Sequence, residues 1–209
     1  MAIEIKMVRS RADSESYIRL PFRIYEDFKE YTPPLLRDER RFHDPRFNRS
    51  LRICDTIRLL AYQNGDVVGR IMGIVHHEHN LKHGLQDVRF FQLDCIQDHA
   101  VASKLIRSVM DWGQAFGMTR IIGPFGFSDK DPQGIQLNGR EIESVIASAS
   151  NPAYIADFIL EMGFIKFKDC VSYLWNIQEQ LPGIYERVAH RLQRNGGYEL
   201  MSFRSRREL

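Results

Sequence analysis

A histidine-rich segment is the first place where this chain could do chemistry. The segment His76-His-Glu-His-Asn-Leu-Lys-His83 carries imidazole and carboxylate groups, which bind metal ions or move protons. Its spacing matches no standard zinc motif and no second ligand cluster accompanies it, so we expect no metal. A solvated loop is the plain interpretation, and a proton-accepting role for His76 or His77 is the alternative.

Two aspartates form a second candidate site. Asp129 and Asp131 lie in Phe125-Gly-Phe-Ser-Asp-Lys-Asp-Pro-Gln-Gly134, whose glycine, aspartate and proline content predicts a long loop. Long ordered loops in compact domains often carry function. The two carboxylates could bind a cationic amine, or they could only cap turns, as aspartate does routinely.

A β-hairpin is the clearest of the elements that must position these groups. The apolar runs Ile57–Gln63 and Val67–Val75 flank Asn64-Gly65, and a type I′ turn needs positive φ at both of its central residues. Two further strands are predicted, over Asp87–Ile96 and Thr119–Gly123.

An amphipathic helix is predicted between those last two strands. Its apolar face has helical spacing and is formed by Val101, Leu105, Val109, Trp112 and Phe116. Asp98 suits the N-cap, where its carboxylate accepts an unpaired backbone N–H and faces the positive end of the helix dipole. Gly117 fits the C-terminal position that needs positive φ.

The N-terminal segment alternates apolar and polar residues over Ile3–Val8, which predicts a strand with one buried face. A helix capped by Asp13 or Ser14 should follow, with Pro21 kinking or splitting it. Arg37–Arg52 predicts a short helix and a loop.

The C-terminal part continues with a helix that Asn151-Pro152 opens and Gly163 ends. The later pattern predicts one or two strands over Phe164–Ile177, an amphipathic helix over Leu181–Leu192 and a strand over Glu199–Arg204. We divide the chain into a main domain, residues 1–178, and a C-terminal extension, residues 179–209.

The bulk composition is that of an ordinary globular protein. Residues are 44% hydrophobic and 27% charged with a net charge of +2, which favours neither nucleic acid nor membrane as a partner. Three cysteines without close spacing argue against disulfides, and Cys95 and Cys170 read as core residues of strands. The N-terminus has no apolar signal region and the chain no membrane span, so a cytoplasmic protein is the default.

The predicted order of strands and helices resembles the GCN5-related N-acetyltransferase superfamily. Asn151…Tyr154…Gly163-Phe164 looks like that superfamily's fourth-helix motif. Four segments look like a family of uncharacterised bacterial acetyltransferase-like proteins: Arg19-Leu-Pro-Phe-Arg-Ile-Tyr25, Pro33-Pro-Leu-Leu36, Gly117-Met-Thr-Arg-Ile-Ile-Gly-Pro124 and Asn151-Pro-Ala-Tyr154. The resemblance implies an α/β (α+β) fold with a mixed, mostly antiparallel central sheet, helices on both faces, and splayed strands that form a cleft.

The resemblance also implies a co-substrate. Acetyl-CoA or another acyl-CoA would lie between the splayed strands, with backbone donors near Leu93 to Ile96 polarising the thioester and the helix start holding the pyrophosphate. No metal is implied. The cofactor residues on this basis are Leu93, Cys95, Ile96, Gln97, His99, Ala100, Ala102, Ser103 and Asn151.

The pyrophosphate loop departs from the family pattern of Gln or Arg, two residues, Gly, one residue, Gly or Ala. Here Gln97 and Ala102 fit, but Ala100 replaces the first glycine. Asp98 places a carboxylate where two phosphates would lie, at a cost on the order of a kcal/mol if unscreened. A protonated His99 would offset part of that repulsion.

The catalytic residues depart from the pattern as well. The family often has a tyrosine acid where this chain has Ile159, and Tyr154 lies more than one helical turn upstream. By resemblance, Asp94 and His77 are the candidate bases for the incoming amine. The residues expected to contact the acceptor are Phe125, Asp129 and Asp131.

These inferences predict an acyl-CoA-dependent N-acyltransferase that acts on a small-molecule or peptide amine. The alternative is a catalytically degenerate domain of the same fold that binds a ligand or a partner, favoured by the lost glycine, Asp98 and Ile159. A third interpretation is an oligomeric scaffold half that needs a second domain. Exposed strand edges at the ends of the sheet predict a homodimer.

Overall fold

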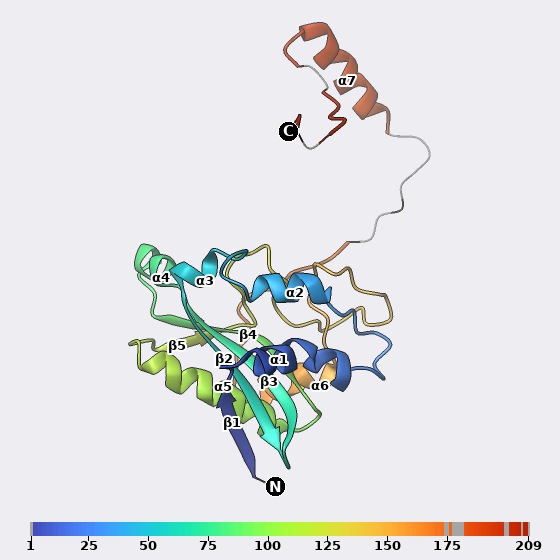
Figure 1. The fold of residues 1–209 in the computed structure, drawn as a ribbon. Coiled ribbons are helices and arrows are strands. Elements are labelled where there is room, and N and C mark those ends of the chain that lie inside the picture. The colour runs from blue at the N-terminus through green and yellow to red at the C-terminus, as the bar shows by residue number, and fades with distance from the viewer. Residues whose placement is uncertain (1, 174–175, 177–181, 199–200, 206, 209) are drawn as a thin grey trace. The chain divides into compact units, whose positions relative to one another are not determined.

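The computed structural model describes residues 2–173, 176, 182–198, 201–205 and 207–208. Two compact units are present, residues 1–165 and 166–209. The first unit holds the sheet and all the candidate site residues (Figure 1). The second contains α7, Gly183–Asn195, which overlaps the predicted amphipathic helix; Leu181 lies outside the described residues.

A five-stranded sheet forms the centre of the first unit, with its strands in sequence order. The strands are β1 (Ile3–Met7), β2 (Asp55–Gln63), β3 (Asp66–Val75), β4 (Asp87–Cys95) and β5 (Arg120–Ile122). The first four are mutually antiparallel, and β5 joins β4 in parallel. Asn64 and Gly65 have φ angles of 55° and 91°, as the predicted hairpin turn requires. The predicted fold class, a mixed and mostly antiparallel open sheet, is confirmed.

A β-bulge interrupts the pairing of β3 with β4. Arg70 pairs with Asp94 and Met72 with Phe91, so two β4 residues, Gln92 and Leu93, face the single residue between them. Gln92 has a φ of 50°, which is uncommon for a residue other than glycine. A bulge leaves its extra residue outside the ladder and bends the strand, and such features often adjoin functional sites.

One face of the sheet is covered by α5, His99–Gln114, with α6, Ala153–Glu161, beside it (Figure 1). The core on this face is apolar and draws on α5 through Val101, Ala102, Leu105, Ile106 and Val109. Glycines allow close approach: a Cβ on Gly113 would lie 2.8 Å from the Val88 side chain. Asp98 is the N-cap of α5, as predicted, and Gly117 has a φ of 77°.

The other face is covered by α1 (Arg11–Ile24), α2 (Leu36–Phe42) and α3 (Ser50–Ile53). The N-cap of α1 is Ser10, not Asp13 or Ser14; Asp13 returns a bond to the Ser10 backbone N–H in a capping box. Pro21 was expected to kink or split this helix; α1 is not split there and runs on to Ile24.

Three further predictions were wrong. His77–His83 forms a short helix, α4, rather than a loop, and Gly84 ends it with a φ of 63°. Cys170 is exposed and outside any strand, whereas Cys95 is buried in β4 as expected. The described residues of Phe164–Ile177 and of Glu199–Arg204 form no strand; residues 174, 175, 177, 199 and 200 lie outside the description.

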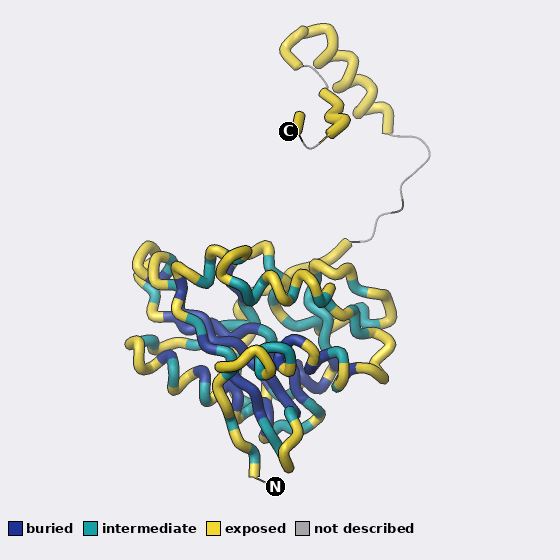
Figure 2. The backbone as a smooth tube through the Cα atoms, in the orientation of Figure 1, coloured by how far each residue is buried: buried dark blue, intermediate teal, exposed yellow. Residues whose placement is uncertain are grey.

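Burial follows the central strands and α5 (Figure 2). A long connection without helix or strand runs from β5 to α6, over residues 123–152. It includes the predicted loop around Asp129 and Asp131 and extends well beyond it. This connection and α2 lie on the face opposite α5, since the Phe127 side chain contacts the small apolar cluster that contains Met72 and Phe91.

Candidate functional site

The edge of β4 that faces β5 is paired only at its beginning. Parallel pairing joins Asp87, Val88 and Arg89 to β5, and the Phe125 N–H then donates to the Phe90 carbonyl at 2.8 Å. Beyond that bond the chain turns into the long connection. The last residues of β4 therefore have no strand beside them on this edge, the separation of strands that the family resemblance implies.

Cys95 faces that open edge. The Ile96 N–H donates to the Val68 carbonyl, so the Ile96 amide is directed toward β3 and cannot polarise a thioester at the open edge. The Cys95 carbonyl is directed the other way, where the Tyr154 hydroxyl of α6 donates to it at 2.7 Å. Because N–H and C=O of one strand residue point to the same side, the Cys95 N–H also faces this edge.

The start of α5 is closed by its own cap. The Asp98 carboxylate accepts the Ala100 N–H at 2.9 Å, and the Asp98 carbonyl accepts the Val101 and Ala102 N–H groups at 3.1 and 3.4 Å. Of these donors, only the Ala100 N–H is bonded to the acidic side chain, because the bonds to the Asp98 carbonyl are backbone bonds that any N-cap residue accepts. A phosphate here has to displace or share that carboxylate.

The other predicted cofactor residues are scattered around that helix start. Gln97 is exposed, His99 lies with its Nε2 3.8 Å from Glu161, and Ser103 is half-buried. Ala102, Leu93 and Cys95 have buried side chains. Asn151 accepts the Gln136 N–H at 2.8 Å and so ties down the long connection.

A buried ion pair lies on the opposite face of the sheet, beside the bulge. Arg70 donates through Nε to Asp94 at 2.7 Å, and the two residues are 3% and 9% exposed. Asp94, predicted as a base or as the partner of a surface cation, is therefore the partner of a buried guanidinium.

Glu39 of α2 completes this cluster. Gln92 donates through Nε2 to the Glu39 carboxylate at 3.0 Å, Arg70 donates to it at 3.5 Å, and the Tyr17 hydroxyl donates to Gln92 Oε1 at 3.2 Å. Burial, the largest effect, and the nearby Asp94 charge raise the pKa of Glu39, against the lowering effect of Arg70. Two carboxylates thus share one guanidinium.

Pro21 explains how Arg70 reaches α1. Proline has no N–H, so the carbonyl four residues earlier in the helix, that of Tyr17, loses its usual donor. Arg70 donates to the Tyr17 carbonyl at 2.9 Å instead. The guanidinium replaces the missing helical bond, which accounts for an uninterrupted α1 and fixes the orientation of Arg70.

The second predicted base lies far from the first. His77 is at the start of α4, bonded to Asp55 at 2.6 Å and half exposed. Arg70, which pairs with Asp94, is five strand residues from Val75, or about 17 Å at 3.3 Å per residue, and His77 is beyond Val75. The structure does not bring Asp94 and His77 together.

The predicted acceptor residues lie at the start of the long connection between β5 and α6. The Arg89 guanidinium lies 4.2 Å from the Phe125 ring centre and donates to the Gly126 and Phe127 carbonyls. Asp131 accepts the Ser128 N–H at 3.0 Å and thus caps a turn, whereas Asp129 is exposed.

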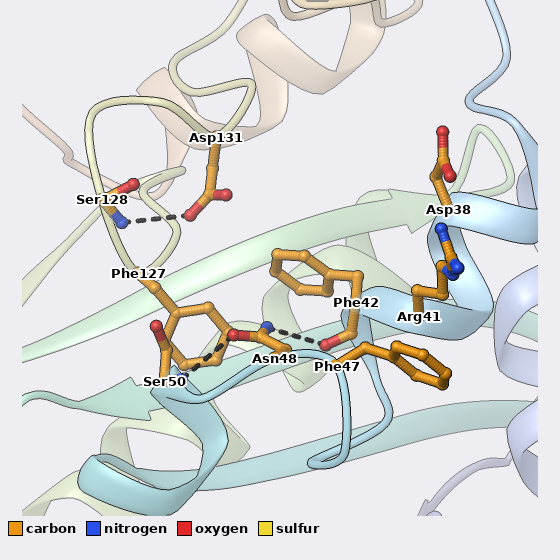
Figure 3. Close-up of a pocket in the computed structure, with 9 residues that line it drawn as sticks. All are labelled: Asp38, Arg41, Phe42, Phe47, Asn48, Ser50, Phe127, Ser128 and Asp131. Atoms are coloured by element: carbon orange, nitrogen blue, oxygen red, sulfur yellow. Dashed lines mark hydrogen bonds between the residues drawn. The ribbon is translucent and has the colours of Figure 1, made fainter. Parts of the chain in front are cut away.

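An open pocket of about 540 Å³ separates this connection from α2 (Figure 3). The rings of Phe42 and Phe127 lie 5.4 Å apart in its wall, and the Arg41 guanidinium is 5.0 Å from the Phe47 ring. Asp38 and Asp131 supply carboxylates from opposite sides. The pocket combines aromatic walls with two acids and one base.

Sequence reasoning missed Glu39, Arg70 and Gln92. Glu39 lies in a run of alternating charges that reads as a solvated surface, and Arg70 and Gln92 are polar residues within otherwise apolar strands. A polar residue in a buried strand was the available signal, since such a group needs a partner.

The described residues hold neither a metal-binding cluster nor a membrane-spanning helix. No group of three or more His, Cys, Asp or Glu among them is arranged to hold a metal ion. In the same part of the chain, no helix is long and apolar enough to cross a bilayer.

Two curated proteins are similar to the chain, and no protein-family model matches it. The bacterial ceramide synthase of Caulobacter vibrioides is 25% identical over 185 residues, 88% of this chain and 48% of that protein. Protein YghO of Escherichia coli is 23% identical over 169 residues, 81% of this chain and 43% of that protein. The chain spans about half the length of the curated relatives it matches.

The solved structures similar to this one include acetyltransferases. An aminoglycoside acetyltransferase from an uncultured soil metagenomic sample is 14% identical, with 85% of this chain and all of that chain covered and a TM-score of 0.46. AAC(6')-Iy with the bisubstrate analogue CoA-S-monomethyl-acetylneamine is 12% identical, with the same coverage and a TM-score of 0.49. Glucosamine-6-phosphate N-acetyltransferase from Arabidopsis thaliana is 9% identical over 84% of this chain and all of that one, with a TM-score of 0.48.

Proposed function

We propose that this chain is the acyl-CoA-binding part of an N-acyltransferase. The observation that carries the proposal is the open edge of β4, where no strand pairs with Cys95 beyond the last contact with β5. A pantetheine arm is an extended chain with amide groups, so it can pair with such an edge as an added strand does. The thioester would then lie beside the bulge, where Leu93 and Gln92 leave the regular ladder.

The acceptor we propose is an amine with an apolar body. A ceramide is the amide of a fatty acid and a long-chain amino alcohol, so the name of the Caulobacter relative points to amide formation on such an amine. The pocket of Figure 3 suits that chemistry, because Phe42, Phe47 and Phe127 offer apolar contact while Asp38 and Asp131 attract an ammonium group.

The reaction would be direct transfer. The amine nitrogen attacks the thioester carbonyl carbon, the C–N bond forms, the C–S bond breaks, and the thiolate leaves with the electron pair. Holding the amine nitrogen over the face of the thioester carbonyl supplies a large part of the rate enhancement. Backbone N–H groups at the bulge and at Cys95 would stabilise the developing oxyanion.

Calorimetric titration of acetyl-CoA and of palmitoyl-CoA into the protein tests the cofactor site. Asp98→Asn removes the carboxylate charge but keeps a good N-cap, so we expect it to tighten binding by about tenfold if the repulsion costs about 1.4 kcal/mol. Ala100→Glu adds a carboxylate at an exposed position of the first turn and should weaken binding. Ala102 is unsuitable for such a control, because its side chain is fully buried.

Absence of binding to wild type and to Asp98→Asn alike would contradict the proposal. It would favour the second candidate, a domain of the same fold that binds another ligand or a partner without catalysis. The specific observation in favour of this candidate is that the Asp98 carboxylate already bonds the Ala100 amide at the start of α5. Binding that tightens in Asp98→Asn would instead assign the phosphates to this helix start.

A further inference from the structure

A buried carboxylate that no prediction included lies beside the bulge. Glu39 reaches the sheet from α2, its side chain is 11% exposed, and it holds the side chain of the bulge residue Gln92 through two contacts of 3.0 and 3.3 Å. Gln92 in turn is held by the Tyr17 hydroxyl. The positive φ at Gln92 is therefore fixed by contacts to two helices, which couples Glu39 to the backbone where the thioester would lie.

The two carboxylates of the cluster have different partners. Asp94 makes the 2.7 Å contact with Arg70, whereas Glu39 is 3.5 Å from the same guanidinium. One positive charge facing two negative charges leaves the cluster one proton short of neutrality. Glu39 has the weaker cationic contact and a raised pKa, so it is the carboxylate of the pair that can accept a proton from a bound group.

The other groups that face Glu39 do not supply a competing base. The charged and titratable residues around it are Arg70 from β3, Asp94 from β4, Tyr17 from α1 and Tyr31 from the α1–α2 connection. Burial raises the pKa of both tyrosines above their usual range, so they stay neutral. Burial also lowers the pKa of the neighbouring His43 to about 2, which makes that imidazole a poor base.

We propose that Glu39 is the catalytic residue that takes the proton from the acceptor amine, an inference that rests on the proposed acyl transfer. As the nitrogen bonds to the thioester carbon, its N–H proton passes to the Glu39 carboxylate. Glu39 then returns the proton to the departing thiolate through solvent, so the products are an amide and a free thiol. Glu39 contacts Gln92 at the bulge of β4, and its neighbours on α2, Asp38, Arg41 and Phe42, line the acceptor pocket, so the same short helix adjoins both proposed reactants.

The test measures thiol release from palmitoyl-CoA with sphinganine, and from acetyl-CoA with 2-amino-1-propanol, for wild type, Glu39→Gln and Glu39→Asp. We expect Glu39→Gln to lower kcat by about a hundredfold, the usual contribution of a general base. The Kd for acyl-CoA should stay within about twofold, because Glu39 is not on the open edge of β4. The rise of wild-type kcat with pH should disappear in Glu39→Gln, and Glu39→Asp should restore part of it.

Glu15→Gln is the matched control. Glu15 also faces α2, through an ion pair with Arg40, but its contacts are on the surface and away from the bulge. It should keep the wild-type kcat and pH profile. A Glu39→Gln variant with more than half the wild-type kcat and an unchanged pH profile would overturn the proposed role of Glu39. It would leave the proposed acyl transfer standing. No acyl-CoA binding by wild type, or binding without transfer to either amine, would overturn the proposed function as well.

Discussion

The two faces of the sheet are built in different ways. On the α5 face, residues such as Val101, Leu105 and Ile71 form a continuous apolar layer, and glycines let helix and strands approach closely. On the α1–α2 face, a guanidinium and two carboxylates are buried among aromatic rings beside a bulge. Apolar burial stabilises the fold directly, whereas burying charges costs free energy that good partners only partly offset. Stability alone does not explain the buried charges of the α1–α2 face, so this face is the better candidate for a functional site.

Removing the shared cation should have the largest effect. Arg70→Met takes away the guanidinium that contacts both Asp94 and Glu39 and leaves the Tyr17 carbonyl without its donor. We expect the free energy of unfolding to fall by about 3–5 kcal/mol, the range for breaking a buried ion pair from one side. Urea unfolding followed by circular dichroism measures it.

The double variant Arg70→Met/Asp94→Leu separates charge from packing. Replacing both partners of a buried pair by apolar residues is often close to neutral, so part of the lost stability should return. The double variant could instead lose more free energy of unfolding than the two single variants lose together. In that case the ion pair with Asp94 is not what makes Arg70 important on this face.

Filling the closest approach on the apolar face should have a smaller effect. Gly113→Ala gains about 1 kcal/mol in helix propensity, but its Cβ would lie 2.8 Å from the Val88 side chain, and overpacking costs about 1–3 kcal/mol. We expect a net loss of stability in the same urea experiment. Ser108→Ala, on the exposed side of α5, has the propensity gain without the contact and should not destabilise. A stabilised Gly113→Ala would show that α5 can move away from the sheet at little cost.

The apolar face was predictable because its signals are local. The spacing of Val101, Leu105 and Val109 predicts one buried helix face, and Asn64-Gly65 predicts the hairpin that carries the strands. Asp98 and Gly117 mark the cap and the positive φ near the helix ends. Each of these signals depends on residues within a few positions of one another. The predictions drawn from them therefore need no knowledge of the rest of the fold.

The polar face was not predictable in the same way. Glu39 meets Gln92 across 53 positions of sequence, and Arg70 reaches Tyr17 across the same separation. Pro21 read as a helix breaker, because the sequence does not reveal that a guanidinium takes over the carbonyl it frees. Asp94 was recognised as a candidate base but its partner was not, and the other candidate, His77, lies at a different strand end.

The smallest effects come from two glutamates, one on α1 and one on α2, which compare exposed with buried charge most directly. Hydrogen bonds from Arg40 and Arg19 lower the pKa of Glu15 to about 2, and burial raises that of Glu39. A lowered pKa adds stability above the unfolded value near 4.5, which is lost as pH falls toward 2. A raised pKa adds stability below that value, which is lost as pH rises through the folded pKa.

Glu15→Gln and Glu39→Gln should therefore respond to pH with opposite signs. Relative to wild type, Glu15→Gln should lose about 0.2–1 kcal/mol at pH 7, since its ion pairs are solvent-screened, and nothing at pH 2. Glu39→Gln should gain relative stability from pH 4.5 upward, because glutamine still accepts from Gln92 but carries no buried charge. Thermal unfolding across this range measures both. Parallel pH curves for the two variants would mean that water reaches Glu39 as freely as it reaches Glu15, and the α1–α2 face would then hold its charges at the surface rather than bury them.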